Sequence, residues 1–197
     1  MPIAFAIVAE WVVKMKNKGI KKSTFKVALC GVIAALSLAL MMISALIPIG
    51  TYAIPCAAGA IIAAIVIECG SRWAVGVYAV VALLSVLLAG DKEAVIYYIA
   101  LFGYYPILKG VIEGKIKNRL LQYILKFALF NAAAIGSFFV AMFLLAIPAE
   151  EFEIFGVYLP WAFLAVGNVF FVLYDYAVTV LIMQYVRVLR GKLFKRF

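Results

Sequence analysis

Residues 161–187, WAFLAVGNVFFVLYDYAVTVLIMQYVR, form a long apolar run with one acid, Asp175, near its middle. A helix of about 20 apolar residues is long enough to cross a bilayer. Asp175 would then lie near the midplane, where an ionisable group costs at least ~2.5 kcal/mol and usually faces a bundle interior or a wet cavity. Asn168 shares a helix face with Asp175. The rest of the chain must supply the interior that this face contacts.

Composition identifies the class of protein. Hydrophobic residues make up 69% of the 197 residues and charged residues 14%, against about 45–50% and 25% in soluble domains. No folded domain of this length can hide so much apolar surface from water, so we predict an all-α integral membrane protein. The chain has no histidine, which excludes His-ligated metals and Ser-His or Cys-His catalytic pairs. We expect no enzyme, no metal site and no cofactor.

The apolar segments predict six transmembrane helices, at about 27–47, 53–68, 73–89, 94–112, 127–147 and 160–186. Residues 2–13 are apolar but too short to span, and we expect an interfacial helix there. The predicted organisation is a cytoplasmic segment 1–26, a transmembrane domain 27–187 and a basic cytoplasmic tail 188–197.

The lysines and arginines are concentrated on one side of this six-span arrangement. With six spans, one side receives both termini, the 68–72 turn and a basic loop at 109–126, and it holds every lysine and arginine except Lys92. The positive-inside rule therefore places both termini in the cytoplasm of a multi-pass cell-membrane protein. The basic segment 14–26 is either an orientation signal or a site for anionic membrane lipid. The net charge of +9 is spread over helix ends, which argues against a nucleic-acid partner.

Small residues line one face of the first span, at Gly31, Ala35 and Ala39. Such stripes allow another helix to approach closely. The stripe is either a docking face for a partner subunit or an internal packing face of the same bundle.

Several stretches of the first half resemble a known family. They are KVALCGVIAALSLAL at 26–40, PIG at 48–50, Ile54-Pro55 and ECGSRWAVGVY at 68–78. They are similar to the substrate-binding S components of energy-coupling factor (ECF) transporters, which are six-helix membrane proteins of about this length. The resemblance implies that Ala35 and Ala39 contact a transmembrane coupling subunit and that ATPase subunits supply the energy. It implies no particular substrate-binding residues.

The polar groups expected at the depth of Asp175 are its possible partners. A pair with Lys109 or a hydrogen bond to a tyrosine is one interpretation, and a ligand or proton site is the other. The candidates at this depth are Tyr104, Tyr105, Ser37 and Ser137.

Further out, Tyr97, Tyr98 and Asn168 would line an outward-facing pocket above Asp175, with Trp161 either in the pocket or in an interfacial aromatic belt. Because the only predicted outer cation is Lys92, we expect a small neutral or cationic micronutrient. The leading hypothesis is a substrate-binding subunit that depends on partner ATPase and coupling subunits. The alternative is a self-contained transporter or channel with Asp175 as an ion or proton site.

Overall fold

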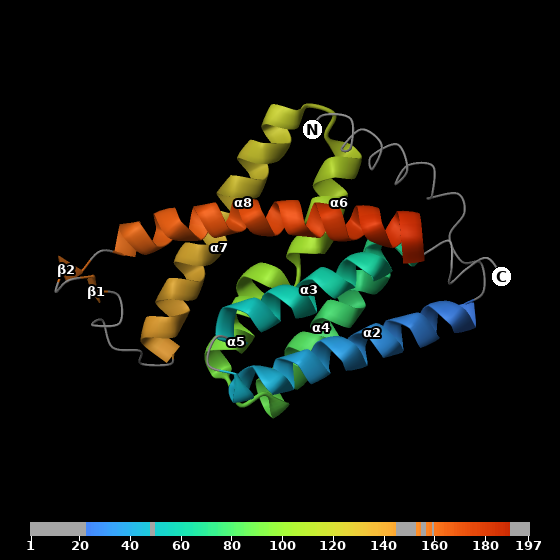
Figure 1. The fold of residues 1–197 in the computed structure, drawn as a ribbon, viewed down its shortest axis with the longest axis horizontal. Coiled ribbons are helices and arrows are strands. Elements are labelled where there is room, and N and C mark those ends of the chain that lie inside the picture. Colours follow the sequence, from blue (N-terminus) through green and yellow to red (C-terminus); the bar gives the residue numbers. More distant parts are fainter. Residues whose placement is uncertain (1–22, 48–49, 145–152, 155–156, 159, 190–197) are drawn as a thin grey trace.

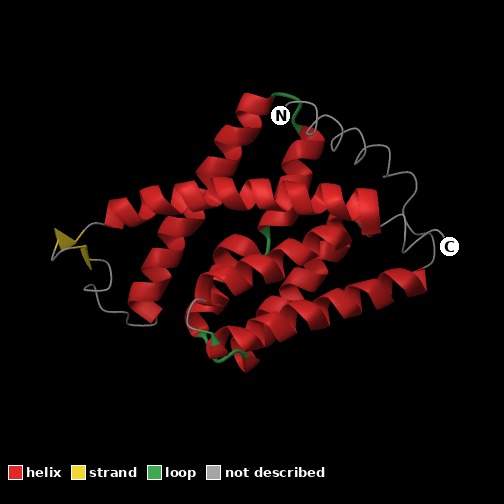
Figure 2. Cartoon of the chain, in the orientation of Figure 1, coloured by secondary structure: helices red, strands yellow, loops and turns green. Residues whose placement is uncertain are grey.

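The computed structural model describes residues 23–47, 50–144, 153–154, 157–158 and 160–189, and this part is almost entirely helical (Figure 1, Figure 2). Its α-helices are α2 (Ser23–Ile43), α3 (Gly50–Glu68), α4 (Ser71–Leu88), α5 (Lys92–Tyr97), α6 (Tyr105–Lys115), α7 (Arg119–Leu144) and α8 (Pro160–Gln184). Shorter elements are the 3-10 turn η1 (Ser44–Leu46), the π-helical turns η2 (Tyr98–Phe102) and η4 (Tyr185–Leu189), and the antiparallel pair β1 (Glu153–Ile154) and β2 (Val157–Tyr158).

Six stretches of the described chain are long and apolar enough to cross a membrane, which confirms the predicted all-α, six-span character. The molecule also exposes large apolar side chains such as Leu83 and Phe170, each 65% exposed. Exposed apolar surface on this scale is expected where lipid replaces water. Which end faces the cytoplasm stays a prediction. The interfacial helix at 2–13 and most of the basic segment and tail lie outside the described residues.

Helix α3 is the centre of the bundle. Half of the residues in its apolar window are buried, against 11% for α7. Ser37 of α2 donates a hydrogen bond of 3.1 Å to the carbonyl of Ala58. At the next residue, Gly59, an added Cβ would lie 2.3 Å from the carbonyl oxygen of Phe102. Only glycine allows α3 and η2 to approach this closely.

The fourth span is broken inside the bundle. It runs as α5 and η2, turns at Gly103 and Tyr104, and resumes as α6. Pro106 has no N–H to donate to the carbonyl of Phe102 one turn earlier. That carbonyl instead accepts a hydrogen bond of 3.2 Å from the hydroxyl of Tyr174 on α8. Interrupted helices at membrane depth are tolerated only where the surrounding protein satisfies the freed groups.

The predicted basic loop at 109–126 is wrong. Lys109 lies within α6 and Lys126 within α7, and the turn between the two helices is only residues 116–118. The physical reason is that the charges at the two ends of this segment, Lys109 and Lys126, form ion pairs inside the protein, as the next subsection describes. The exposed charges are only those in the middle of the segment, at Lys115, Lys117 and Arg119.

Candidate functional site

Asp175 of α8 lies at the centre of a buried cluster of charges. Its Oδ1 contacts the Nζ of Lys109, the Nζ of Lys126 at 3.2 Å and the hydroxyl of Tyr105 at 2.5 Å. Glu113 completes the cluster through its Oε1, which lies 3.0 Å from Lys109 and 2.5 Å from Lys126. We call these five residues the ion cluster.

Helix geometry explains how the ion cluster forms. Tyr105, Lys109 and Glu113 follow one another at spacing four along α6, so they share one face. Lys126 reaches the same point from α7, and Asp175 from α8. The cluster therefore ties α8 to the consecutive helices α6 and α7.

The ion cluster is neutral as a whole but costly to disturb. The side chains of Lys109 and Lys126 are 1% and 2% exposed, and that of Asp175 is 12% exposed. Two lysines balance two carboxylates, so the five residues of the cluster carry no net charge together. Removing one member of such a buried set leaves an uncompensated charge and typically costs 3–5 kcal/mol.

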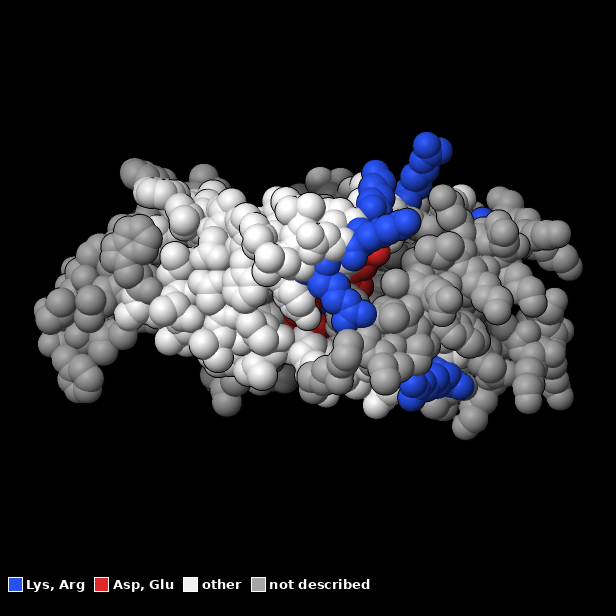
Figure 3. All heavy atoms as spheres, turned by 90° about the horizontal axis from the view of Figure 1, so that it is seen from above, with Lys and Arg blue, Asp and Glu red and all other residues white. Residues whose placement is uncertain are grey.

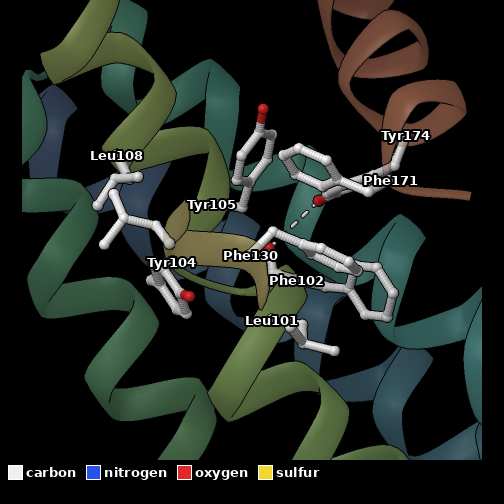
Figure 4. Close-up of a pocket in the computed structure, with 9 residues that line it drawn as sticks. Leu101, Phe102, Tyr104, Tyr105, Leu108, Phe130, Phe171 and Tyr174 are labelled. Atoms are coloured by element: carbon white, nitrogen blue, oxygen red, sulfur yellow. Dashed lines mark hydrogen bonds between the residues drawn. The ribbon is translucent and has the colours of Figure 1, made fainter. Parts of the chain in front are cut away.

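Aromatic side chains form a layer beside the ion cluster (Figure 4). Phe171 stacks on Phe130 of α7 with ring centroids 4.4 Å apart. Its ring also meets Tyr105 edge-on at 5.1 Å. Tyr174 lies on α8, as Phe171 does, and its ring contacts those of Phe102 and Tyr105. Tyr105 thus belongs to both groups, with its ring in the aromatic layer and its hydroxyl on Asp175.

The cavity within this layer is narrow. Its volume is about 10 Å³, roughly the minimum that holds one water. Its lining residues are Leu101, Phe102, Tyr104, Tyr105, Leu108, Leu129, Phe130, Phe171 and Tyr174. A ligand larger than water would enter only if α7 or α8 moved away from the broken fourth span.

A basic surface lies over the turn between α6 and α7. Figure 3 shows lysine and arginine side chains gathered there, with acidic atoms in the hollow beneath them. Lys115, Lys117 and Arg119 are exposed at this turn, whereas Glu113 is partly buried. The turn between α6 and α7 therefore presents an exposed cationic face near acidic atoms.

Asn168 does not contact Asp175. It forms a reciprocal amide pair with Asn131 of α7, in which each side chain donates to the other over 2.9 Å. Each amide also donates to a carbonyl of its own helix. This pair fastens α7 to α8 on the Pro160 side of Asp175.

The other predicted pocket residues are dispersed. Tyr97 donates to Glu93 at 2.8 Å and stacks beside Tyr52. Tyr98 is fully buried in the core formed with α2, α3 and α4. Tyr104 lines the narrow cavity. Trp161 is the second residue of α8, and its side chain lies outside what the structure describes. The described residues of the predicted set thus form no common pocket.

Only some of the partners expected for Asp175 contact it in the structure. Of the four polar groups expected at its depth, only Tyr105 contacts it. Ser137 donates to a carbonyl of its own helix, at Ala133. The predicted Lys109–Asp175 pair is confirmed.

The predicted docking residues Gly31, Ala35 and Ala39 are all exposed. A Cβ added at Gly31 would meet nothing within 4 Å. Within the described part of the chain, the stripe is therefore not used for internal packing. Its role in docking stays a prediction.

Sequence reasoning missed several residues that the structure places at the site. Lys126 and Glu113 had been assigned to a loop, and Asn131 was not among the candidate residues. Helical spacing could have found Glu113, since it follows Lys109 by one turn. The aromatic residues Phe130, Phe171 and Tyr174 could not be distinguished in sequence from lipid-facing ones.

Comparison of the chain with protein-family models, with curated proteins and with solved structures finds no match.

Proposed function

We propose that this protein is a membrane-embedded substrate-binding subunit for uptake of a small neutral or cationic micronutrient, working with partner ATPase and coupling subunits. The observation that carries the proposal is the joining of a broken membrane helix, an aromatic-lined cavity and a neutral buried ion cluster in one place. Aromatic walls with a few polar groups are typical of small-molecule sites. Interrupted helices and intramembrane charges are typical of transport proteins.

The ion cluster favours a neutral ligand over a cationic one. Asp175 already faces two lysines and a tyrosine hydroxyl, so a cationic ligand would have to displace a lysine. An aromatic ligand group, in contrast, could stack on Phe130 or Phe171 without replacing a charged member of the ion cluster. Stacking contributes about 0.5–1.5 kcal/mol per ring pair beyond the buried area.

Ligand entry requires movement in this proposal. Since the cavity is almost closed, the described state corresponds to an occluded or empty form. Opening α7 and α8 would break contacts of the ion cluster and the Asn131–Asn168 pair. Partner subunits that hydrolyse ATP, as the ECF resemblance implies, would supply that energy.

Alanine substitutions at two neighbouring phenylalanines of α8, one lining the cavity and one exposed, test the site. Native mass spectrometry of the purified protein would first identify a co-purified small molecule. Phe171→Ala should then lower affinity for that molecule at least tenfold, because Phe171 is 4% exposed and lines the cavity. Phe170→Ala, at a position that is 65% exposed, should bind normally. Equal affinity in the two variants would overturn the proposed site.

A second test addresses the partner subunits. A bulky residue at exposed Ala35, Ala35→Trp, should block assembly with the coupling subunit while leaving ligand binding intact. The purified chain alone should bind ligand in liposomes without accumulating it.

The alternative is a self-contained transporter in which the ion cluster binds an ion or proton. Four charges buried between three helices favour it, because protonation could loosen their contacts. Uphill transport by the purified chain in response to a pH gradient would establish this alternative and exclude the first.

A further inference from the structure

A second cavity lies between α2 and α4. Its volume is about 410 Å³, far larger than that of the aromatic cavity, and it is open along the surface. Its lining residues are Cys30, Ala34, Arg72, Trp73, Gly76, Val77 and Val80. We call it the α2–α4 groove.

Small residues create the groove. Gly76 of α4 and Ala34 of α2 leave the space between the two helices unfilled. A Cβ added at Gly76 would meet nothing within 4 Å. In a bilayer such a space takes an acyl chain or another helix, since water is excluded from an apolar groove at that depth.

Basic residues lie near one end of the groove, and their charge distinguishes between an acyl chain and a helix as its occupant. Arg72 lines the groove at the start of α4, is exposed, and has no ion-pair partner among the described residues. Lys26 lies one helical turn before Cys30 on α2, close enough for its charge to act on the neighbouring Cys69 thiol. No lining residue is acidic.

We propose that the α2–α4 groove is a binding site for an anionic phospholipid. One acyl chain lies along Ala34, Gly76 and Val80, and the phosphate lies against Arg72 and Lys26. Trp73, 39% exposed beside Arg72, lies at the level where indole rings meet lipid headgroups. A partner helix would fill only the apolar part of the groove, whereas a phospholipid also brings a phosphate to the exposed Arg72. This proposal does not depend on the identity of the transported substrate.

The test compares two lipids on the purified full-length chain. Delipidated protein is titrated with phosphatidylglycerol or with phosphatidylcholine of the same acyl chains, and bound lipid is measured by native mass spectrometry. We expect tighter binding of phosphatidylglycerol. Arg72→Gln should weaken that binding about fivefold, as expected for loss of one basic residue beside an anionic lipid surface.

Two matched controls separate a built site from general surface charge. Lys117→Gln removes one exposed charge at the α6–α7 turn and should change phosphatidylglycerol binding less than twofold. Gly76→Leu fills the groove and should reduce binding of both lipids. Gly31→Leu, at a glycine that is equally open but does not line the groove, should leave it unchanged.

Several results would overturn the proposal. They are equal retention of the two lipids, equal effects of Arg72→Gln and Lys117→Gln, or unchanged binding in Gly76→Leu. A photoreactive acyl chain on phosphatidylglycerol should crosslink to peptides of α2 and α4. A photoreactive residue placed at Trp73 tests for the other occupant. A crosslink from it to another polypeptide, with no lipid adduct, would show that a protein helix occupies the groove. Both Arg72 and Gly76 are exposed, so these variants should fold, and their melting temperatures check this.

Discussion

Replacement of Asp175 by asparagine should destabilise the protein more than the loss of any single uncharged hydrogen bond in the bundle. The variant keeps the shape of the side chain but leaves Glu113 as the one carboxylate among the five residues of the cluster, so these residues carry one net positive charge. Because both lysines are almost fully buried, the expected cost is about 3–5 kcal/mol. At about 2–4 °C per kcal/mol for a chain of this size, the melting temperature should fall by about 6–20 °C.

A double-mutant cycle with Lys126→Met isolates the cause. Lys126→Met alone leaves a net negative charge and should also destabilise. The double variant Asp175→Asn/Lys126→Met restores neutrality with Lys109 and Glu113, so its loss should be smaller than the sum of the two single losses by more than 0.5 kcal/mol. Tryptophan fluorescence during heating in detergent measures all three variants. A melting temperature within 2 °C of wild type for Asp175→Asn, or additive losses in the double variant, would refute the reasoning.

The same cycle also separates a structural from a ligand-binding role of Asp175. If its carboxylate only holds α8 against α6 and α7, the double variant should recover ligand affinity together with stability. If it touches the ligand, the double variant should recover stability while binding stays weak. Measurement below the melting temperature of every variant keeps the two readouts independent.

Three further predictions follow from packing, hydrogen bonding and burial. Gly59→Ala should destabilise by about 1–3 kcal/mol because its methyl group meets the backbone of η2, whereas Gly76→Ala should be neutral in the same thermal assay. Asn168→Ala removes both hydrogen bonds of the Asn131–Asn168 pair and should lower stability by about 1.2 kcal/mol, at about 0.6 kcal/mol for each bond between membrane helices. A loss as large as that of Asp175→Asn would contradict this ranking. Burial raises the pKa of the Cys69 thiol to about 12, so its thiolate is scarce at neutral pH. Alkylation of Cys69 in the native protein should therefore be slow at pH 7, and its rate should rise about tenfold per pH unit up to the pKa. Rapid labelling of Cys69 at pH 7 would contradict this prediction.

The sequence predicted the helices well because each span is a long apolar run, and length alone identifies it. It also predicted the kind of partner that Asp175 has, since a buried carboxylate requires a cation or a donor. Lys109 and a tyrosine were both named. Lys126 was missed because a lysine at a helix end is expected to reach water, and only the tertiary structure shows that it turns inward.

The pocket was harder to predict for a different reason. Depth in the membrane follows from residue number, but the direction of a side chain around the helix axis depends on which neighbour packs there. Asn168 and Asp175 share a face and lie at different depths, and each found a separate partner on another helix. Tyr97 and Tyr98 are adjacent in sequence and point to different environments. Uniformly apolar helices carry little pattern from which those directions could be read.

The ion cluster has a consequence for the order in which the protein is made. When α6 has been synthesised, Lys109 and Glu113 balance each other within one helix. Addition of α7 brings Lys126 and leaves the interior with one excess positive charge. Only α8 supplies Asp175 and closes the cluster. A nascent chain that stops before α8 therefore differs from the finished protein in electrical charge as well as in length, a difference that membrane quality control could recognise.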